Sequence, residues 1–361
     1  MSAKDNKRDL FVDAVKGIGI ISIVIGHASW DIPFGGHVIH AGPFVYLYHL
    51  AVFAFCTGYL FKPDIPDIWS YIGKKAKGLY RPFLLYSLLY LLTRNLFIKI
   101  GIIAGTMSTP GDMLVSFSNT LTFNSPGELL GALWFVPMLF FASILYAAIW
   151  KVTERISGKG VRETVKVLCY MAFGVAGVYA MKHSMGLLCN LQVAYLFIPV
   201  IAAGHYFRRL SGKRILNPVG LILSFGILVY VVYSDLGIIE LSRYMIINEW
   251  LFYPVTFVGI YFCLSLAKLL CRISVLERFL ALAGQYSFAI MSLHLLGFKI
   301  VDYIVCRISG QMDMLNAYPR SFDSIWPVYY LVGVGFPMMI QYMINTMKNT
   351  KCNKQKLINK N

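Results

Sequence analysis

The sequence predicts an all-α, polytopic integral membrane protein with about ten transmembrane helices and both termini in the cytoplasm. Apolar residues make up 58% of the 361 residues, charged residues make up 14%, and the mean hydropathy is +0.64. Soluble proteins do not have this composition. The basic residues stand in short clusters between long apolar runs, as in the loops of membrane proteins. The net charge of +16 therefore does not indicate a nucleic-acid partner.

Hydropathy divides the chain into ten apolar runs that are long enough to cross a bilayer. Prolines inside several of these runs are compatible with membrane helices, where neighbouring groups satisfy the freed backbone. The predicted spans are residues 10–28, 43–61, 81–99, 128–150, 164–182, 188–206, 216–234, 248–270, 280–298 and 325–347.

The distribution of lysine and arginine predicts the orientation of these spans. If residues 1–16 are cytoplasmic, 26 of the 33 basic residues fall on the cytoplasmic side, as the positive-inside rule requires. We therefore expect a single transmembrane domain over residues 1–361, multi-pass in the plasma or inner membrane and surrounded by its lipids. The connection 100–127 is expected to be an external loop or a re-entrant hairpin, and residues 348–361 a basic cytoplasmic tail.

The first span is apolar almost throughout, yet it carries three ionisable side chains, Asp13, Lys16 and His27. Lys16 and His27 are eleven residues apart, which is about three helical turns and ~16 Å along the axis, so they share one face. Ionisable groups inside a bilayer are costly and indicate function. A single buried histidine is more often a hydrogen-bonded core residue, but the lysine on the same stripe favours a functional role for His27.

Other histidines and one tryptophan are weaker candidates. His49 and His294 are predicted inside spans, whereas His37 and His40 fit an exposed polar loop. The four histidines from His27 to His49 lack the spacing of metal ligands, and no carboxylate or thiol completes a set, so no metal is expected. For Trp134, lining of a pocket and ordinary packing are equally good interpretations.

A basic cluster, KKAKGLYRPF over residues 74–83, precedes the third span. Such a cluster is usually a topology signal, but Lys77 and Arg81 are also what a phosphate-bearing cytosolic ligand needs. The sequence contains no GxSxG, P-loop, GxGxxG or HExxH motif, so the chemistry is not that of those enzymes.

These stretches resemble membrane-bound acyltransferase family 3, in its polysaccharide O-acetyltransferase and fucose-4-O-acetylase-like branch. Lys16 and His27 fill the positions of a family signature in which a basic residue, ten others and a histidine follow one another. The matching stretches are RDLFVDAVKGIGIISIVIGH, HLAVFAFCTGYLF, KKAKGLYRPF, LWFVPMLF and YSFAIMSLHLL.

The resemblance implies an O-acyltransferase that moves an acyl group, usually acetyl, from cytosolic acetyl-CoA to a hydroxyl of a glycan or glycolipid of the cell envelope. His27 would be the catalytic residue, and Lys16, Lys77 and Arg81 would bind the phosphates of the coenzyme. Relatives often carry two arginines three residues apart, whereas Lys77 and Arg81 are four apart. Many relatives also have an extracytoplasmic domain, so we expect this chain to work alone or with separate envelope-polysaccharide machinery.

Acyl transfer needs a base for the alcohol proton and a donor for the oxyanion. His27 suits the role of base because an imidazole titrates near neutral pH, and a covalent acyl-histidine is the alternative. His294, Trp134 and backbone amides are candidates for the oxyanion, and His49 for catalytic support. The sequence leaves open whether the acyl group is acetyl or succinyl. A transporter or glycan flippase is the alternative function, and a scaffold subunit a third.

Overall fold

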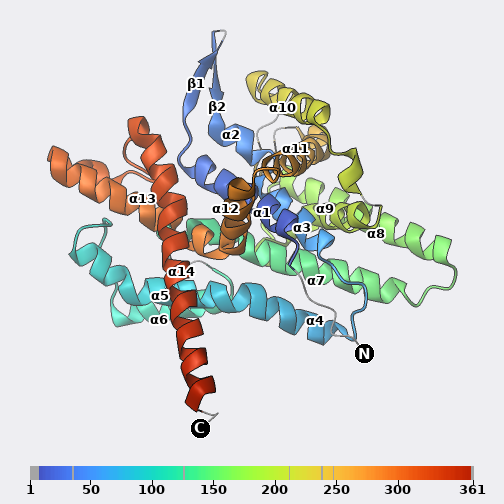
Figure 1. Ribbon diagram of the computed structural model, residues 1–361, viewed down its shortest axis with the longest axis horizontal. Coiled ribbons are helices and arrows are strands. Elements are labelled where there is room, and N and C mark those ends of the chain that lie inside the picture. Colours follow the sequence, from blue (N-terminus) through green and yellow to red (C-terminus); the bar gives the residue numbers. More distant parts are fainter. Residues whose placement is uncertain are drawn as a thin grey trace.

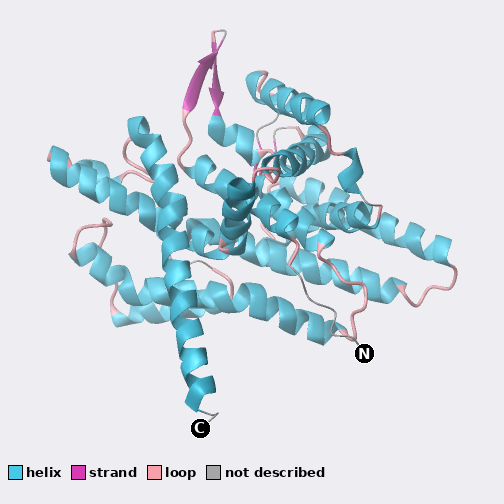
Figure 2. Cartoon of the chain, viewed as in Figure 1, coloured by secondary structure: helices cyan, strands magenta, loops and turns pink. Residues whose placement is uncertain are grey.

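The computed structural model describes residues 8–34, 36–124, 127–210, 212–236, 239–246 and 248–358. The chain is almost wholly helical, and its longest strands form one small hairpin at the top of the molecule (Figures 1 and 2). The predicted fold class, an all-α polytopic membrane protein, is confirmed. The α-helices are α1 (Leu10–His27), α2 (Ala41–Tyr46), α3 (His49–Tyr59), α4 (Ile68–Lys75), α5 (Arg81–Lys99), α6 (Pro110–Leu121), α7 (Phe135–Thr153), α8 (Lys159–Lys182), α9 (Leu191–Arg209), α10 (Pro218–Tyr233), α11 (Glu249–Leu270), α12 (Ser274–Gln285), α13 (Ser287–Ser309) and α14 (Trp326–Ile358).

Shorter elements join these helices. A π-helical turn connects α4 to α5, and a 3-10 helix, η2, leads directly into α7. Two antiparallel hairpins complete the structure, with Asp31 opposite His40 in the first and Ile239 opposite Ile246 in the second. The short elements are the π-helical turn (Ala76–Tyr80), η2 (Glu128–Trp134), β1 (Asp31–Phe34), β2 (His37–His40), β3 (Ile239–Glu240), β4 (Met245–Ile246) and 3-10 turns at Leu188–Asn190, Gly212–Ile215, Leu241–Arg243, Met312–Asn316 and Asp323–Ile325.

All ten predicted spans overlap helices, and eight segments of the described chain are long and apolar enough to cross a membrane. The two that do not meet this measure are α5, whose average hydropathy is lower, and α10, which has only 16 residues. The count of ten and the cytoplasmic placement of both termini stay predictions.

The predicted boundaries of the ninth span, residues 280–298, are wrong. Residues 280–298 are divided between α12 and α13, which meet at Tyr286. The apolar run continues across this junction, so hydropathy alone could not detect it. Helix α14 continues to Ile358 and so includes most of the basic segment after residue 348, whose cytoplasmic placement stays a prediction.

The connection 100–127 folds back along α5. Asn95 of α5 donates to the Ser108 carbonyl at 2.9 Å, just before α6 begins, and Tyr80 donates to the Leu121 carbonyl at 2.8 Å, where α6 ends. The helix α6 therefore runs antiparallel to α5 over most of its length. This path is compatible with both predicted forms of the connection, an external loop and a re-entrant hairpin, and the choice between them stays a prediction.

Helix α1 lies at the centre of the molecule and packs against α3, α11, α12, α13 and α14 (Figure 1). Its tightest contact is with α12. A Cβ atom at Gly17 would lie 2.1 Å from the Leu280 carbonyl oxygen, and one at Gly284 only 1.8 Å from that of Asp13. Only glycine permits the two backbones to approach so closely. This contact fixes the half of α1 that carries Lys16.

Candidate functional site

The charged end of α1 is held by a buried carboxylate. Asp9 caps the helix by accepting hydrogen bonds from Phe11 and Val12, and Asp13 follows one turn later. Asp13 is buried, and its two oxygens face Arg8 at 2.5 Å and Lys16 at 3.4 Å. Since a buried carboxylate needs cationic partners, Asp13 holds both cations at this end of the helix.

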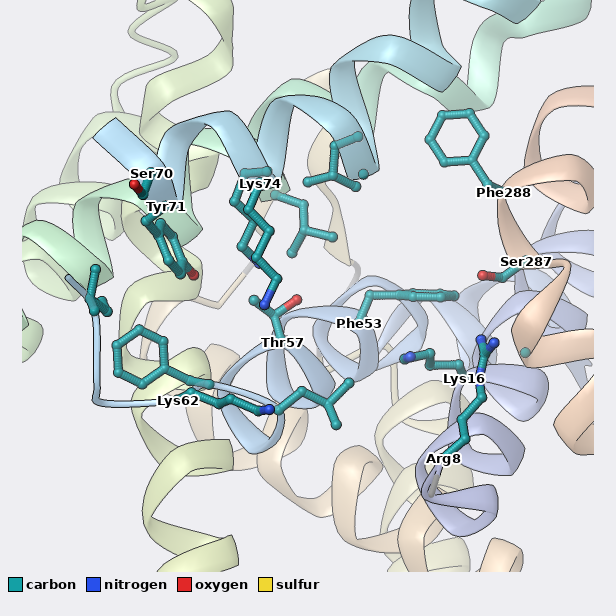
Figure 3. Close-up of a pocket in the computed structure, with 18 of the residues that line it drawn as sticks. Arg8, Lys16, Phe53, Thr57, Lys62, Ser70, Tyr71, Lys74, Ser287 and Phe288 are labelled. Atoms are coloured by element: carbon teal, nitrogen blue, oxygen red, sulfur yellow. The ribbon is translucent and has the colours of Figure 1, made fainter. Parts of the chain in front are cut away.

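Lys16 faces a cavity of about 620 Å³, which we call the cationic cavity. Five cations and one carboxylate line it, so its charge is strongly positive. In Figure 3, Lys74 points from α4 toward Thr57, while Lys62 and Lys16 reach the same space from opposite sides. The lining comprises Arg8, Lys16, Phe53, Thr57, Leu60, Phe61, Lys62, Asp64, Ile65, Pro66, Ser70, Tyr71, Lys74, Lys75, Gly78, Leu79, Leu139, Gly284, Gln285, Ser287 and Phe288.

Helix α4 supplies its cations from one face. Residues 71, 74, 75 and 78 follow one another at helical spacing and all line the cavity, which is the pattern of a single helix face. Lys77 lies on another face and Arg81 beyond the π-helical turn. Both are exposed and stand outside the described lining. Lys77 and Arg81 are the two residues of this cluster that were predicted to bind phosphate. Their neighbours Lys74 and Lys75 face the cavity together with Lys16.

The charge of Lys75 is sensitive to its surroundings. Burial lowers the pKa of Lys75 to about 8, and the nearby charges of Lys74 and Lys16 contribute to this shift. The ammonium form therefore predominates below about pH 8 and the neutral amine above it. An anion bound beside Lys75 restores a partner charge and favours the ammonium form.

His27, at the other end of α1, faces a second cavity of about 550 Å³, which we call the His27 cavity. Trp134, from the end of η2, lines the same cavity, so the structure brings these two predicted residues together. Aromatic rings and polar side chains from four parts of the chain surround them. The lining comprises Gly26, His27, Ser29, Tyr46, Gly131, Trp134, Glu240, Ser242, Arg243, Tyr318, Pro319, Arg320 and Asp323.

Two further imidazoles lie close to His27. The ring of His294 is 5.1 Å from that of His27, centroid to centroid, and is fully buried. Nδ1 of His294 lies 2.9 Å from the Ile290 carbonyl, and Nδ1 of His49 lies 2.9 Å from the Val45 carbonyl. Since a carbonyl only accepts, each Nδ1 carries the hydrogen, and each neutral ring presents Nε2 as an acceptor.

This tautomer changes the expected role of His294. Its Nε2 is buried and has no hydrogen-bond partner in the described structure, which is a costly arrangement unless a donor arrives. A hydrogen-bond acceptor cannot stabilise an oxyanion. The geometry therefore favours a role in which Nε2 of His294 accepts a hydrogen bond from an N–H or O–H group. The catalytic role of His294 stays a prediction. Among the described residues, no three His, Cys, Asp or Glu side chains are grouped closely enough to hold a metal, and the absence of a metal stays a prediction.

A family model described as an acyltransferase domain, that of acyltransferase family 3, matches residues 9–344. The chain belongs to acyltransferase family 3. It is therefore a membrane acyltransferase, and the family match gives no support to a transporter or flippase. The specific branch suggested by the sequence stays a prediction. Neither a search of curated proteins nor a search of solved structures found a match.

The sequence analysis missed a buried ion pair that holds one wall of the acyltransferase's His27 cavity. Lys299 lies 3.4 Å from Asp302 on α13, and both are buried. Lys299 also donates to the Leu315 carbonyl at 2.9 Å, and Asp302 accepts from the backbone of Ser321 at 3.1 Å. The pair thus ties down residues 311–325, the loop that supplies four lining residues. Its sequence signal was a lysine and an aspartate three residues apart in an apolar helix.

We predict that Lys299→Met destabilises the acyltransferase by about 3–5 kcal/mol, because it leaves Asp302 buried without its cation. The measurement is thermal unfolding in detergent, combined with limited proteolysis of the 311–325 loop. Lys299→Met combined with Asp302→Asn removes the unpaired charge and is expected to recover part of the loss. Lys182→Met, which breaks a more exposed ion pair with Glu249, is the control. Equal losses in Lys299→Met and Lys182→Met would contradict the role assigned to the buried pair.

Proposed function

We propose that this membrane acyltransferase transfers an acetyl group from cytosolic acetyl-CoA to a hydroxyl group of a cell-envelope or exported glycan. The observation that carries the proposal is that α1 lines two cavities, with Lys16 at one and His27 at the other. In the predicted orientation, the cationic cavity opens toward the cytoplasm and the His27 cavity toward the outside of a plasma or inner membrane.

The cationic cavity fits the polar part of coenzyme A. Phosphates form strong charge-assisted hydrogen bonds with lysine and arginine, and Arg8, Lys16, Lys62, Lys74 and Lys75 all line it. Aromatic rings in the same lining offer stacking surfaces for an adenine. The extended pantetheine arm is comparable in length with the ~16 Å between Lys16 and His27 along α1. The thioester can therefore reach His27 while the phosphates stay at the cations.

The His27 cavity has the character of a site for a neutral, hydroxyl-rich acceptor. Arg243 lies 3.5 Å from Glu240, and Arg320 pairs with Asp323, so its charges compensate one another. Paired charged groups offer both donors and acceptors to hydroxyls, and aromatic side chains such as Tyr318 pack against the apolar faces of sugar rings. This supports a glycan, or the glycan part of a glycolipid, as acceptor.

In the proposed reaction, His27 takes the proton from the acceptor hydroxyl as its oxygen attacks the thioester carbonyl carbon. The carbon–sulfur bond then breaks, and the leaving thiolate receives the proton from His27. The protonated ring carries two N–H groups, and Nε2 of His294 is a neighbouring acceptor that can hold one of them. Trp134 lines the same cavity, and its indole N–H is our candidate donor to the oxyanion.

A covalent route uses the same residues. His27 attacks the thioester first, and the acceptor then receives the acetyl group from the acyl-histidine. This route predicts a burst of free coenzyme A equal to the amount of enzyme before any acceptor is added. The direct route predicts no burst.

We predict that His27→Ala lowers the rate of acetyl transfer by about 10²–10⁴-fold, the usual contribution of a general base. The assay measures release of free coenzyme A from acetyl-CoA by native membrane vesicles that contain the acceptor. His183→Ala is the matched control, because His183 is exposed at the end of α8 and lines neither cavity. Full activity in the His27→Ala protein would remove the catalytic assignment.

We also predict that binding of acetyl-CoA weakens as the pH rises through about 8, because Lys75 then loses the positive charge that faces the phosphates. The measurement is the KM for acetyl-CoA between pH 6.5 and 9.5. Lys75→Arg keeps its charge over this range and is expected to remove the change. Lys75→Gln is expected to raise the KM at low pH to the value that the natural protein has at high pH. A KM that rises in the same way in Lys75→Arg would contradict the assignment.

A further inference from the structure

The two cavities lie along the same helix, α1, and have separate linings. Their linings share no residue in the described structure. Along α1, Lys16 faces one and Gly26 the other, while along η2 and α7, Trp134 faces the His27 cavity and Leu139 the cationic one. A substrate arm that reaches His27 from the cationic cavity must therefore pass the layer between these positions.

Phe53 lines the cationic cavity from α3. Its ring extends from α3 toward Ser287 (Figure 3). On one side it lies against α1 at Gly19, where a Cβ atom would be only 3.2 Å from Cε2 of Phe53. On another side its centroid is 5.6 Å from that of Phe135, which precedes the cavity residue Leu139 by one helical turn and follows Trp134 directly. The Phe53 ring and its Phe135 neighbour thus meet α1 at Gly19, a position between Lys16 and Gly26 along the helix.

The segments of α1 and α7 that cross this layer contain no ionisable side chain. Residues 17–25 of α1 and 135–138 of α7 include no Lys, Arg, His, Asp or Glu. An uncharged acyl group can pass between apolar rings at little cost, whereas a carboxylate must leave both water and the cations behind it. Because the acyl group leads the pantetheine arm, it meets this layer before any other part of the coenzyme.

We propose that Phe53 and Phe135, closed over Gly19, form an apolar neck that selects the acyl group by size and charge. The neck opens by rotation of the Phe53 side chain and admits short, uncharged acyl groups to His27. It excludes acyl groups that end in a carboxylate. This inference rests on the proposed use of acyl-CoA, and it favours acetyl over the succinyl alternative that the sequence left open.

The test compares acetyl-CoA, butyryl-CoA and succinyl-CoA as donors. Butyryl and succinyl have chains of the same length, so they differ mainly in charge, whereas acetyl and butyryl differ only in size. The rate of coenzyme A release by native membrane vesicles is measured for each donor, with the His27→Ala protein as background. The expected kcat/KM for succinyl-CoA is on the order of 100-fold below that for butyryl-CoA, from the cost of an unpaired charge in an apolar layer.

Two variants change the neck in opposite directions. Phe53→Ala removes the ring and is expected to raise the rate with butyryl-CoA relative to acetyl-CoA about tenfold, while succinyl-CoA stays slow. Gly19→Ala adds one methyl group against the ring and is expected to lower the rate with butyryl-CoA more than that with acetyl-CoA. Phe173→Ala is the matched control, because Phe173 packs on Tyr195 and lines neither cavity, and it is expected to leave all donor ratios unchanged.

The outcomes separate this inference from the proposed function. If the natural protein uses succinyl-CoA as fast as butyryl-CoA, the neck does not select against charge and the inference is overturned, while acyl transfer stands. The same holds if neither Phe53→Ala nor Gly19→Ala changes the ratio of butyryl to acetyl transfer. If the natural protein consumes no acyl-CoA at all, both the proposed function and the proposed selection by the neck are overturned.

Discussion

The rest of the structure depends on the buried carboxylate of Asp13. An apolar membrane helix can carry Lys16 at its foot only if the lysine has a partner, and Asp13 provides it while also holding Arg8. The same turn of α1 is pressed against α12, whose Gly284 leaves no space between the two backbones. Electrostatics and close packing therefore act on the same residues. They set the position of Lys16 and, through the rigid helix, that of His27 eleven residues later.

A central helix fixed in this way would allow the proposed transfer from a cytosolic donor to an external acceptor without movement of a large domain. The cationic cavity and the His27 cavity receive side chains from opposite ends of the same helices. The apolar contact of Phe53 with Gly19 lies between their α1 residues, Lys16 and Gly26. In the proposed mechanism, a flexible substrate arm crosses past Phe53, and the helices keep their arrangement.

Much of this could be predicted from the sequence, because it follows from local pattern. Each of the ten spans predicted from hydropathy overlaps a helix. The spacing of Lys16 and His27 indicated that both lie on one face of α1. The boundary at Tyr286 could not be predicted, since α12 and α13 form one continuous apolar run. Lys74 and Lys75 were not selected because which face of α4 meets the cavity depends on tertiary packing.

The His27 cavity was the least predictable part. Glu240, Arg243 and Arg320 come from connections far from α1 in the sequence, and no local pattern indicates where such connections fold. The ion pair of Lys299 and Asp302 holds one of these connections, residues 311–325, and its i, i+3 spacing was a local signal in the sequence. The structural role of this pair depends on the folded position of the loop that it binds, which no local pattern predicts. Distance along the chain, rather than residue type, limited the prediction.

The most direct test of the central claim is an experimental structure of the protein in a lipid nanodisc with a non-hydrolysable thioether analogue of acetyl-CoA. The account predicts density for the phosphates among Arg8, Lys16 and Lys74, with the arm directed past Phe53 toward His27. Phosphate density at the exposed side chains of Lys77 and Arg81 instead, with the cationic cavity empty, would contradict it.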